Sequence, residues 1–366
     1  MRAVRFIALL FVAAVAAASD GPYVFRDGAH AWKALSVQSE GGEDRKHIAS
    51  LARGASITVD AVGAAPAFKV RLREPAQPPP DEIRVARTAP LFVVADTHGE
   101  YEILVSMLQK HGVVNQKLAW KFGRGHLVLL GDVFDRGPNH TEILWLVYQL
   151  EADARRAGGG VHLLLGNHET MVLNGDLRYL NPRYVQTTSL LGFASYSHLF
   201  DSTSVLGQWL RTLPAVLKIN DLLFLHAGLS PALVESRMSL ADINAGVRLG
   251  LGDAQPENDA QRDRLSLLMG SSGPLWYRGY FAEQTRFPTA TPADVARALE
   301  AFGARRILIG HTIVPAVTPL YEGKVIAVQV YPRRDESGQA NFESVLLKNG
   351  EFWRARLDGS VERLAL

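Results

Sequence analysis

Short apolar segments of strand length recur along this chain, and five of them end in a cluster of polar residues. Helix-like stretches separate several of these segments, as at 100–111 and 141–156, where apolar residues recur three and four positions apart. Strand, loop and helix in repeated succession predict an α/β domain. The strand candidates are 90–95, 127–130, 161–165, 222–225, 306–309 and 325–330.

The polar clusters lie where open α/β sheets bind ligands, because the loops after the carboxyl ends of the strands gather at one edge. We therefore expect the five clusters to converge in space. Each cluster alone is compatible with a buried histidine or a turn, so the prediction rests on their joint occurrence. They are Asp96-Thr97-His98-Gly99-Glu100, Gly131-Asp132-Val133-Phe134-Asp135-Arg136-Gly137, Gly166-Asn167-His168-Glu169, His226-Ala227-Gly228 and Gly310-His311-Thr312.

These residue types favour a site for divalent cations. Carboxylates and neutral imidazoles bind Zn²⁺, Mn²⁺ and Fe. Two ions roughly 3.5–4 Å apart can polarise a phosphoryl group and share an activated water. The chain has no cysteine, which excludes disulfides, thiolate metal sites and a cysteine nucleophile. Hydrolysis assisted by two metals needs no covalent intermediate, so it is compatible with this composition.

The first eighteen residues have the pattern of a secretory signal peptide. Arg2 and Arg5 accompany the apolar stretch 6–15, and the alanines at 16–18 offer small residues for cleavage before Ser19. The apolar stretch is shorter than a typical transmembrane helix. An uncleaved N-terminal anchor is the alternative. We expect an exported protein, periplasmic or secreted, without a membrane span.

The series of clusters resembles the calcineurin-like metallophosphoesterases and, within them, the phosphoprotein phosphatase (PPP) family. The segments 132–137 and 166–169 are the most specific matches, because simpler phosphoesterases lack the Asp-Arg-Gly and the Glu after His. The export signal, 276–280 (Trp-Tyr-Arg-Gly-Tyr) and 310–312 resemble the Shewanella-like branch of that family. The resemblance spans 89–330, about two thirds of the chain. It implies a central β-sandwich flanked by helices, with the metal site at the carboxyl ends of the strands.

The resemblance also implies two bound divalent ions, with Mn²⁺ expected and Fe or Zn²⁺ as alternatives. Ala95 and Ala227 replace glycines that are usual in the family, and both are small enough to be tolerated. The C-terminal Tyr-Cys motif of eukaryotic members is absent, so no tyrosine role is transferred. The implied ligands are Asp96 and His98 for the first ion, Asp132 as the bridge, and Asn167, His226 and His311 for the second ion.

Four further residues receive catalytic roles from the resemblance. His168 would be the general acid that protonates the leaving oxygen, and Asp135 would be its carboxylate partner. Arg136 and Arg278 would bind the phosphate, for which the planar guanidinium offers paired N–H donors. Arg278 rests on a short motif, and a surface arginine in a glycine-bounded loop is the alternative.

The remaining segments surround the expected catalytic domain, 89–366. The extension 19–88 includes a proline-rich connector at 75–80 and carries no recognisable chemistry. The stretch 174–215 is too long for a simple connection and is expected to form a helical cap over the site. A helix over 292–302 is predicted from its start and stop signals. Closing strands are expected at 342–347 and 352–357.

The expected function is hydrolysis of phosphomonoesters, either on phosphorylated proteins or on small phosphoesters. Phosphotyrosine and phosphoserine or phosphothreonine both stay open, and nothing in the sequence indicates an oligomeric state. The alternatives are a hydrolase of dinucleoside polyphosphates such as diadenosine tetraphosphate, and a pseudo-phosphatase that binds without turnover. The second is disfavoured because no implied ligand is missing. Nucleic acid is not an expected partner, since acidic and basic residues nearly balance and no basic block occurs.

Overall fold

The computed structural model describes residues 20–28, 31–74, 77–252, 256–282, 288–334, 336, 338 and 340–366. The expected signal peptide, 1–18, and residues 75–76 of the proline-rich connector lie outside the described residues. Within the described ranges, no helix has both the length and the apolar character needed to cross a membrane.

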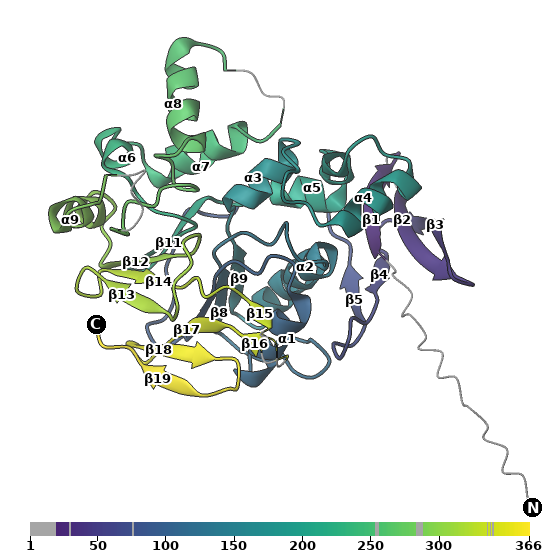
Figure 1. Cartoon of the computed structure of the whole chain (residues 1–366), viewed down its shortest axis with the longest axis horizontal. Coiled ribbons are helices and arrows are strands. Elements are labelled where there is room, and N and C mark those ends of the chain that lie inside the picture. Colours follow the sequence, from purple (N-terminus) through teal and green to yellow (C-terminus); the bar gives the residue numbers. More distant parts are fainter. Residues whose placement is uncertain are drawn as a thin grey trace, which may run out of the picture.

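Two six-stranded sheets form the centre of the molecule (Figure 1). The first has the order β19-β18-β17-β7-β8-β9, and the second has the order β13-β14-β12-β11-β10-β6. The strands of the first sheet are β7 (Leu91–Val94), β8 (His126–Leu129), β9 (Gly160–Leu163), β17 (Glu343–Lys348), β18 (Glu351–Arg356) and β19 (Val361–Arg363). Those of the second are β6 (Glu82–Ile83), β10 (Val216–Ile219), β11 (Leu222–Leu225), β12 (Arg306–Ile309), β13 (Thr318–Leu320) and β14 (Val325–Ala327).

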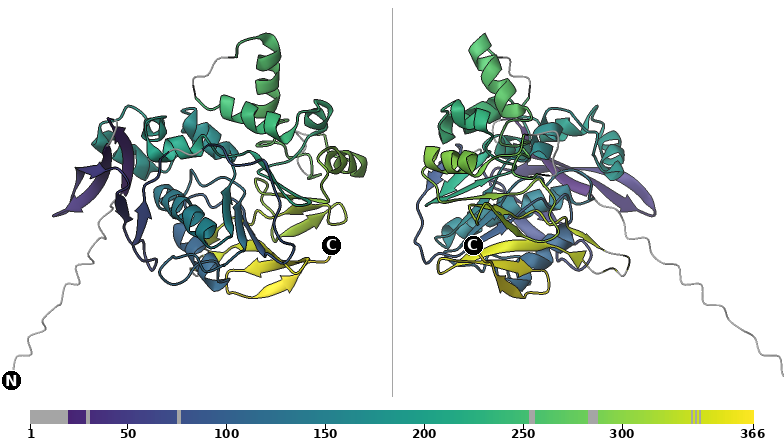
Figure 2. Two further views of the ribbon diagram at one scale, coloured as in Figure 1. Left: turned by 180° about the vertical axis from the view of Figure 1, so that it is seen from behind. Right: turned by 60° about the vertical axis from the view of Figure 1, so that its left-hand side comes forward.

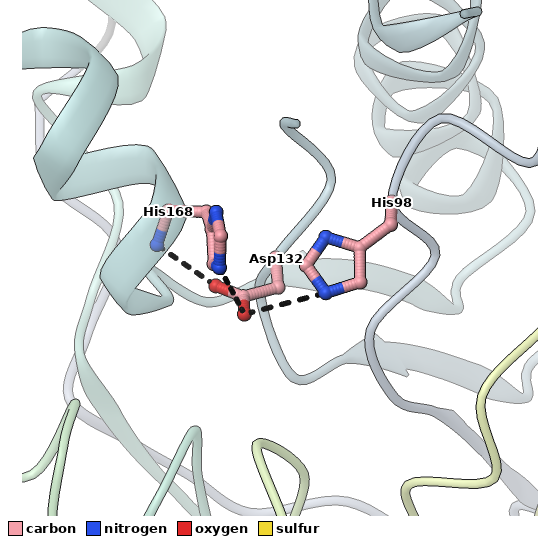
Figure 3. A group of neighbouring side chains, drawn as sticks. All are labelled: His98, Asp132 and His168. Atoms are coloured by element: carbon pink, nitrogen blue, oxygen red, sulfur yellow. Dashed lines mark hydrogen bonds and ion pairs between the residues drawn. The ribbon is translucent and has the colours of Figure 1, made fainter. Parts of the chain in front are cut away.

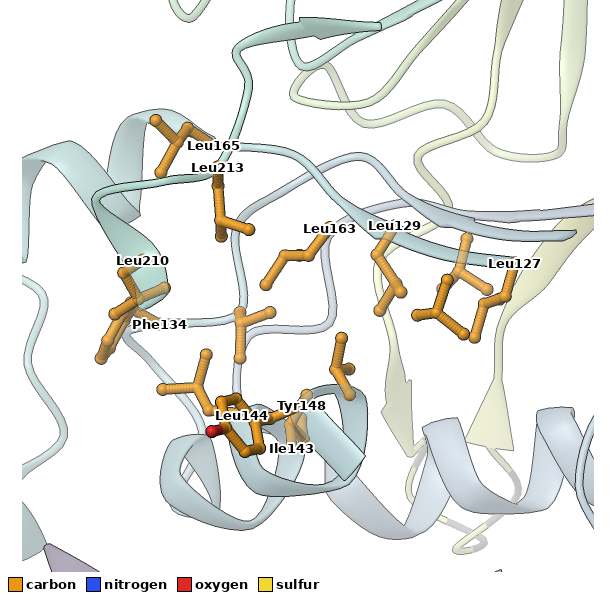
Figure 4. Packing of buried hydrophobic residues seen from close by; sticks show 14 of the residues in the cluster. Leu127, Leu129, Phe134, Ile143, Leu144, Tyr148, Leu163, Leu165, Leu210 and Leu213 are labelled. Atoms are coloured by element: carbon orange, nitrogen blue, oxygen red, sulfur yellow. The ribbon is translucent and has the colours of Figure 1, made fainter. Parts of the chain in front are cut away.

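The apolar character of the central strands follows from burial on both faces. In and after β8, Val128 and Leu130 belong to the core cluster between the two sheets. Leu127 and Leu129 point the opposite way, toward Ile143 and its neighbours on a covering helix (Figure 4). A strand buried on both faces needs a continuous apolar run, as the sequence predicts here. The predicted central β-sandwich is thereby confirmed.

Helices cover the outer faces of the two sheets. α1 (Tyr101–Lys110) and α2 (His140–Arg156) pack on the first sheet, while α7 (Leu240–Leu249) and α9 (Pro292–Ala301) pack on the second. The predicted start of α9 is confirmed: the Thr291 side chain accepts a hydrogen bond from the Asp294 N–H, and Pro292 occupies the first turn.

The N-terminal segment forms strands that the sequence analysis did not identify. β1 (Asp20–Asp27), β2 (Ala31–Glu40) and β3 (Glu43–Ala52) make a separate antiparallel sheet. Figures 1 and 2 show this sheet, in purple, at one side of the molecule next to α4 (Pro182–Leu191). The hairpin of β4 (Ser56–Val59) and β5 (Phe68–Arg71) packs on α2.

Two groups of helices lie on the side of the molecule to which the strand carboxyl ends point. Within 174–215, α4, the 3-10 helix η1 (Tyr196–Phe200) and α5 (Val205–Leu210) contact one another and the N-terminal sheet. A second group was not predicted and projects beyond the sandwich (Figure 1). It consists of α6 (Pro231–Glu235), α7 and α8 (Asp259–Met269). The remaining elements are α3 (Asn167–Leu173), β15 (Arg333–Arg334) and β16 (Ala340–Asn341).

Candidate metal centre

The loops that follow β7, β8, β9, β11 and β12 meet at one end of the sandwich, because β7–β9 are mutually parallel and β11 is parallel to β12. Backbone hydrogen bonds join the loops, including one from the His98 N–H to the Asp132 carbonyl at 2.9 Å. A Cβ on Gly131 would lie 2.4 Å from the Gly166 nitrogen, so only glycine allows the second and third loops to approach. The five polar clusters therefore converge, as their placement in the sequence predicts.

Several residues of these loops hold a backbone conformation that non-glycine residues rarely adopt. Each such conformation costs about 1–3 kcal/mol and persists only where the surrounding structure imposes it. Concentration of strain at one place is typical of functional sites. The residues with positive φ in these loops are His98, Asp132, Asp135, Arg136 and His311.

Asp132 lies at the middle of the converged loops. Its Oδ2 atom is 3.8 Å from His98 Nε2 and 3.2 Å from His226 Nε2. Its Oδ1 atom accepts a hydrogen bond from the His168 N–H at 2.9 Å (Figure 3). One carboxylate thus faces two groups of potential ligands, which is the arrangement that a bridging ligand requires.

The first group of ligand atoms contains Asp96 and His98 together with Asp132. His98 Nδ1 lies 2.9 Å from the Phe134 carbonyl, to which it donates, so its Nε2 is the ring atom left to face the carboxylates. That Nε2 is 4.0 Å from Asp96 Oδ2. Burial lowers the pKa of His98 to about 3, which keeps the ring in the neutral form that a metal needs.

The second group surrounds His226, whose Nδ1 donates to the Leu130 carbonyl at 2.8 Å. In that tautomer Nε2 carries a lone pair, yet it lies 2.9 Å from Asn167 Oδ1 and 3.1 Å from His311 Nδ1. Acceptor atoms this close repel one another unless a proton or a cation lies among them. The donor set therefore fits a divalent cation, and all four residues including Asp132 are buried.

The electrostatics of this second group lead to the same conclusion. Burial alone would lower the pKa of His226, but the carboxylates of Asp132 and Asp96 raise it to about 9. Burial, aided by Asp132, raises the pKa of Asp96 to about 7 although His226 opposes the shift. The carboxylates of Asp132 and Asp96 therefore stabilise a positive charge at His226. A divalent ion would take the place of the imidazole proton, so its binding would release protons.

His168 has the surroundings of a proton donor. Its Nδ1 is 2.5 Å from Asp135 Oδ2, and both side chains are buried. Burial opposes protonation, but Asp132 and Asp135 raise the pKa of His168 above its ordinary value. Because Asp135 occupies Nδ1, only Nε2 can serve the site. His168 Nε2 lies 3.8 Å from Asp132 Oδ2, so the position is compatible with a general acid and also with a third ligand beside His98.

Glu169 holds two of the converged loops together, a role that the sequence analysis did not assign. Its carboxylate accepts hydrogen bonds from the N–H groups of Gly166 at 2.7 Å, Asp132 at 2.8 Å and Val133 at 2.7 Å. The side chain is fully buried. Glu169 follows Gly166, the N-cap residue of α3, by three positions, which is the spacing of a capping box. This spacing could have indicated the role.

The two predicted phosphate-binding arginines both lie at the centre. Arg278 is half-buried, and its Nη1 donates to the His311 carbonyl at 3.2 Å and to Thr312 Oγ1 at 3.0 Å. Arg136 is exposed, and its guanidinium lies 5.9 Å from the ring of Tyr179 and 5.5 Å from that of Tyr331. Neither tyrosine was predicted, because a single aromatic residue in a loop carries no pattern.

A family model and two relatives of known class are similar to this chain. Residues 89–315 match the model of the calcineurin-like phosphoesterase family. Shewanella-like protein phosphatase 1 of Plasmodium berghei is 28% identical over 233 residues, which are 62% of this chain and 62% of that protein. The symmetrical bis(5'-nucleosyl)-tetraphosphatase of Vibrio cholerae is 28% identical over 160 residues, 43% of this chain and 52% of that protein. This chain thus matches less than two thirds of the length of either relative.

A solved structure is similar over nearly its whole length. It is that of a cold-active protein-tyrosine phosphatase from a psychrophilic Shewanella species, with a TM-score of 0.82 and 35% sequence identity. The similarity covers 94% of this chain and 99% of that one. On the family match and this structural likeness, the chain belongs to the calcineurin-like phosphoesterase family, in the phosphoprotein phosphatase branch with the Shewanella-like phosphatases.

Proposed function

We propose that this protein is a two-metal phosphatase that hydrolyses phosphate monoesters on protein side chains. The observation that carries the proposal is the position of Asp132 between two groups of buried ligand atoms, with His168 and two arginines beside it. The Shewanella structure described as a protein-tyrosine phosphatase makes phosphotyrosine the first candidate substrate, with phosphoserine and phosphothreonine as the alternatives.

The residues of the site would divide the reaction among them. Two divalent ions, held by the six proposed ligands, would neutralise the phosphate charge and supply a nucleophilic water at neutral pH. Arg136 and Arg278 would orient the phosphate through paired N–H donors. His168 would give its Nε2 proton to the departing oxygen, while Asp135 holds Nδ1–H and stabilises the charged ring.

A panel of substrates tests the proposal against the dinucleotide alternative. The protein is stripped with a chelator, reloaded with Mn²⁺, Zn²⁺ or Fe²⁺, and assayed for phosphate release from phosphotyrosine and phosphoserine peptides of one sequence. Diadenosine tetraphosphate is assayed in parallel. We expect metal-dependent turnover of a phosphopeptide, with Mn²⁺ the most effective ion. Stoichiometric binding of phosphopeptide without release, or turnover of the dinucleotide alone, would overturn the proposal.

We also propose that the protein acts outside the cytoplasm, after cleavage before Ser19. The supporting feature is the basic, apolar and small-residue order of the first eighteen residues. Expression of the full chain in a bacterium, followed by fractionation and N-terminal sequencing, tests this. The expected result is a periplasmic or secreted protein that begins at Ser19, and an intact chain in the cytoplasm would contradict it.

A further inference from the structure

Two tyrosines from distant parts of the chain flank the phosphate-binding Arg136 at the rim of the metal centre. We propose that Tyr179 and Tyr331 are specificity residues, which select aryl phosphates by packing against the ring of the substrate. The inference rests on the proposed phosphatase function and adds to it the side chains that recognise phosphotyrosine.

Tyr179 lies on the side of the centre where the leaving group must be. Its ring is 5.4 Å from the ring of His168, between centroids. The oxygen that His168 protonates has to come within hydrogen-bond reach of Nε2, so the group attached to that oxygen passes beside Tyr179. The backbone fixes this position, because the Arg136 N–H donates to the Tyr179 carbonyl at 3.0 Å and Asn181 Nδ2 donates to the Arg136 carbonyl at 2.7 Å.

Tyr331 also lies near Arg136, with its ring 5.5 Å from the guanidinium, and that ring is 5.8 Å from the ring of His98. It borders a cavity of about 660 Å³ that Arg136, Ile313 and Pro315 also line. This volume lies within the range of about 300–1,000 Å³ that is typical of ligand sites. The cavity therefore gives room beside the metal centre for a substrate side chain and part of its peptide.

The exposure of apolar side chains at this rim supports a role in binding. Tyr179 is 47% exposed and Ile313 is 58% exposed, and they are two of the six exposed large apolar residues of the described part. Single exposed apolar residues are common on protein surfaces, so the position of these two carries the argument: both lie in the surroundings of Arg136. Arg136 is exposed, and no ion pair joins it to an acidic residue in the described part of the chain, so its charge is available to the phosphate.

The chemistry of the two leaving groups explains why these tyrosines would discriminate. Phosphotyrosine presents an aromatic ring directly behind the departing oxygen, and aromatic pairs favour offset or edge-to-face packing. Phosphoserine presents only a methylene group, which leaves the two rings without an aromatic partner. Each tyrosine is therefore expected to favour the phosphotyrosine substrate by roughly threefold to tenfold in kcat/KM.

The test compares Tyr179→Ala and Tyr331→Ala with Tyr179→Phe and Tyr331→Phe in the full metal-loaded protein. Each is assayed on phosphotyrosine and phosphoserine peptides of one sequence, and on phenyl phosphate against glycerol 2-phosphate. Val361→Ala, at an exposed position on β19, is the surface control. The alanine variants should lose roughly threefold to tenfold on both aryl substrates, mainly through KM, and less than about twofold on the alkyl substrates. The phenylalanine variants should retain the selectivity.

Equal losses on aryl and alkyl substrates would overturn the inference, because the tyrosines would then act only by holding Arg136. Unchanged selectivity in the alanine variants would overturn it too. Thermal unfolding of each variant separates these results from a folding defect, and the phenylalanine variants supply a second test if an alanine variant does not fold. Failure of the proposed function looks different, since the wild-type protein would then release no phosphate from any of these substrates.

Discussion

At the scale of single residues, two backbone carbonyls determine what the centre can bind. The carbonyls of Phe134 and Leu130 accept the Nδ1–H groups of His98 and His226, and this leaves both Nε2 atoms turned toward Asp132. Such contacts behind a ligand fix its tautomer and its orientation. The sequence motifs predict the ligand residues, but they do not predict the carbonyls, because a backbone acceptor has no sequence signature.

Replacement of His168 by asparagine tests the proton-donor role. The variant should lose roughly 10²–10⁴-fold in kcat on an alkyl phosphate, whose leaving oxygen needs the proton. The loss on p-nitrophenyl phosphate should be much smaller, because nitrophenolate leaves readily without one. Parallel kcat measurements on the two substrates decide the matter. Equal losses on both, accompanied by a lower metal content, would instead make His168 a ligand.

The Glu169 carboxylate offers a second test at this scale, because it binds three backbone N–H groups of two catalytic loops. Glu169→Ala should leave these buried donors unpaired, each at a cost of about 1–3 kcal/mol. We expect a clear loss of thermal stability together with weaker metal binding. Glu322→Ala, a change of an exposed glutamate, serves as the control. A variant as stable and as metal-bound as the wild type would show that these contacts do not hold the loops.

At the scale of elements, the sequence predicted what is local and missed what depends on distant partners. Strand β8 and helix α9 follow from nearby signals, an apolar run and a Thr-Pro start. β10, with Lys218 in its middle, is stabilised by pairing with β11 and by packing on α7. The strands β1–β3 are stabilised by pairing with one another and by packing on α4 and α5. The patterns of β1 to β3 mix polar and apolar residues because parts of both faces meet solvent. The convergence of the polar clusters was predictable because each cluster follows a strand, whereas Tyr179 and Tyr331 come together only in the folded chain.

One buried network joins the N-terminal sheet to the loop after β8 across three elements. Arg183 of α4 lies 3.7 Å from Asp20 of β1 and 3.6 Å from Glu142 of α2. Its Nη1 also donates to the Pro138 carbonyl at 3.0 Å, next to Gly137 of the loop after β8. The N-terminal sheet therefore supports the loop that carries Asp135 and Arg136.

This network predicts a pH dependence of stability. Burial raises the pKa of Glu142 to about 7, although Arg183 opposes the shift. The folded protein holds a proton there that the unfolded chain releases above its ordinary pKa, so the contribution to stability falls as pH rises from about 4.5 through 7. Glu142→Gln should flatten this dependence by on the order of 3 kcal/mol between pH 4.5 and 8. Denaturant unfolding at a series of pH values measures the free energy of unfolding, with Glu322→Gln as the control. The same pH dependence of this free energy in wild type and in Glu142→Gln would refute the prediction.

At the scale of the whole molecule, two sheets place five loops from across the chain at one end of the sandwich. Helical groups and the N-terminal sheet lie around that end (Figure 1). Arg136 belongs to the loop after β8, and the rings of Tyr179 and Tyr331 lie near its guanidinium. The proposed function depends above all on Asp132, which would join two metal ions into a single hydrolytic centre.

Titration of metal-stripped protein with Mn²⁺ tests that claim most directly, with calorimetry and phosphate release followed in the same samples. We expect two ions per chain, proton release on binding, and activity that appears as the second ion binds. Asp132→Asn should bind at most one ion tightly and lose more than about a hundredfold in activity, since even changes behind the ligands cost 10–100-fold. Full turnover by the metal-stripped protein, or wild-type activity in Asp132→Asn, would contradict the account.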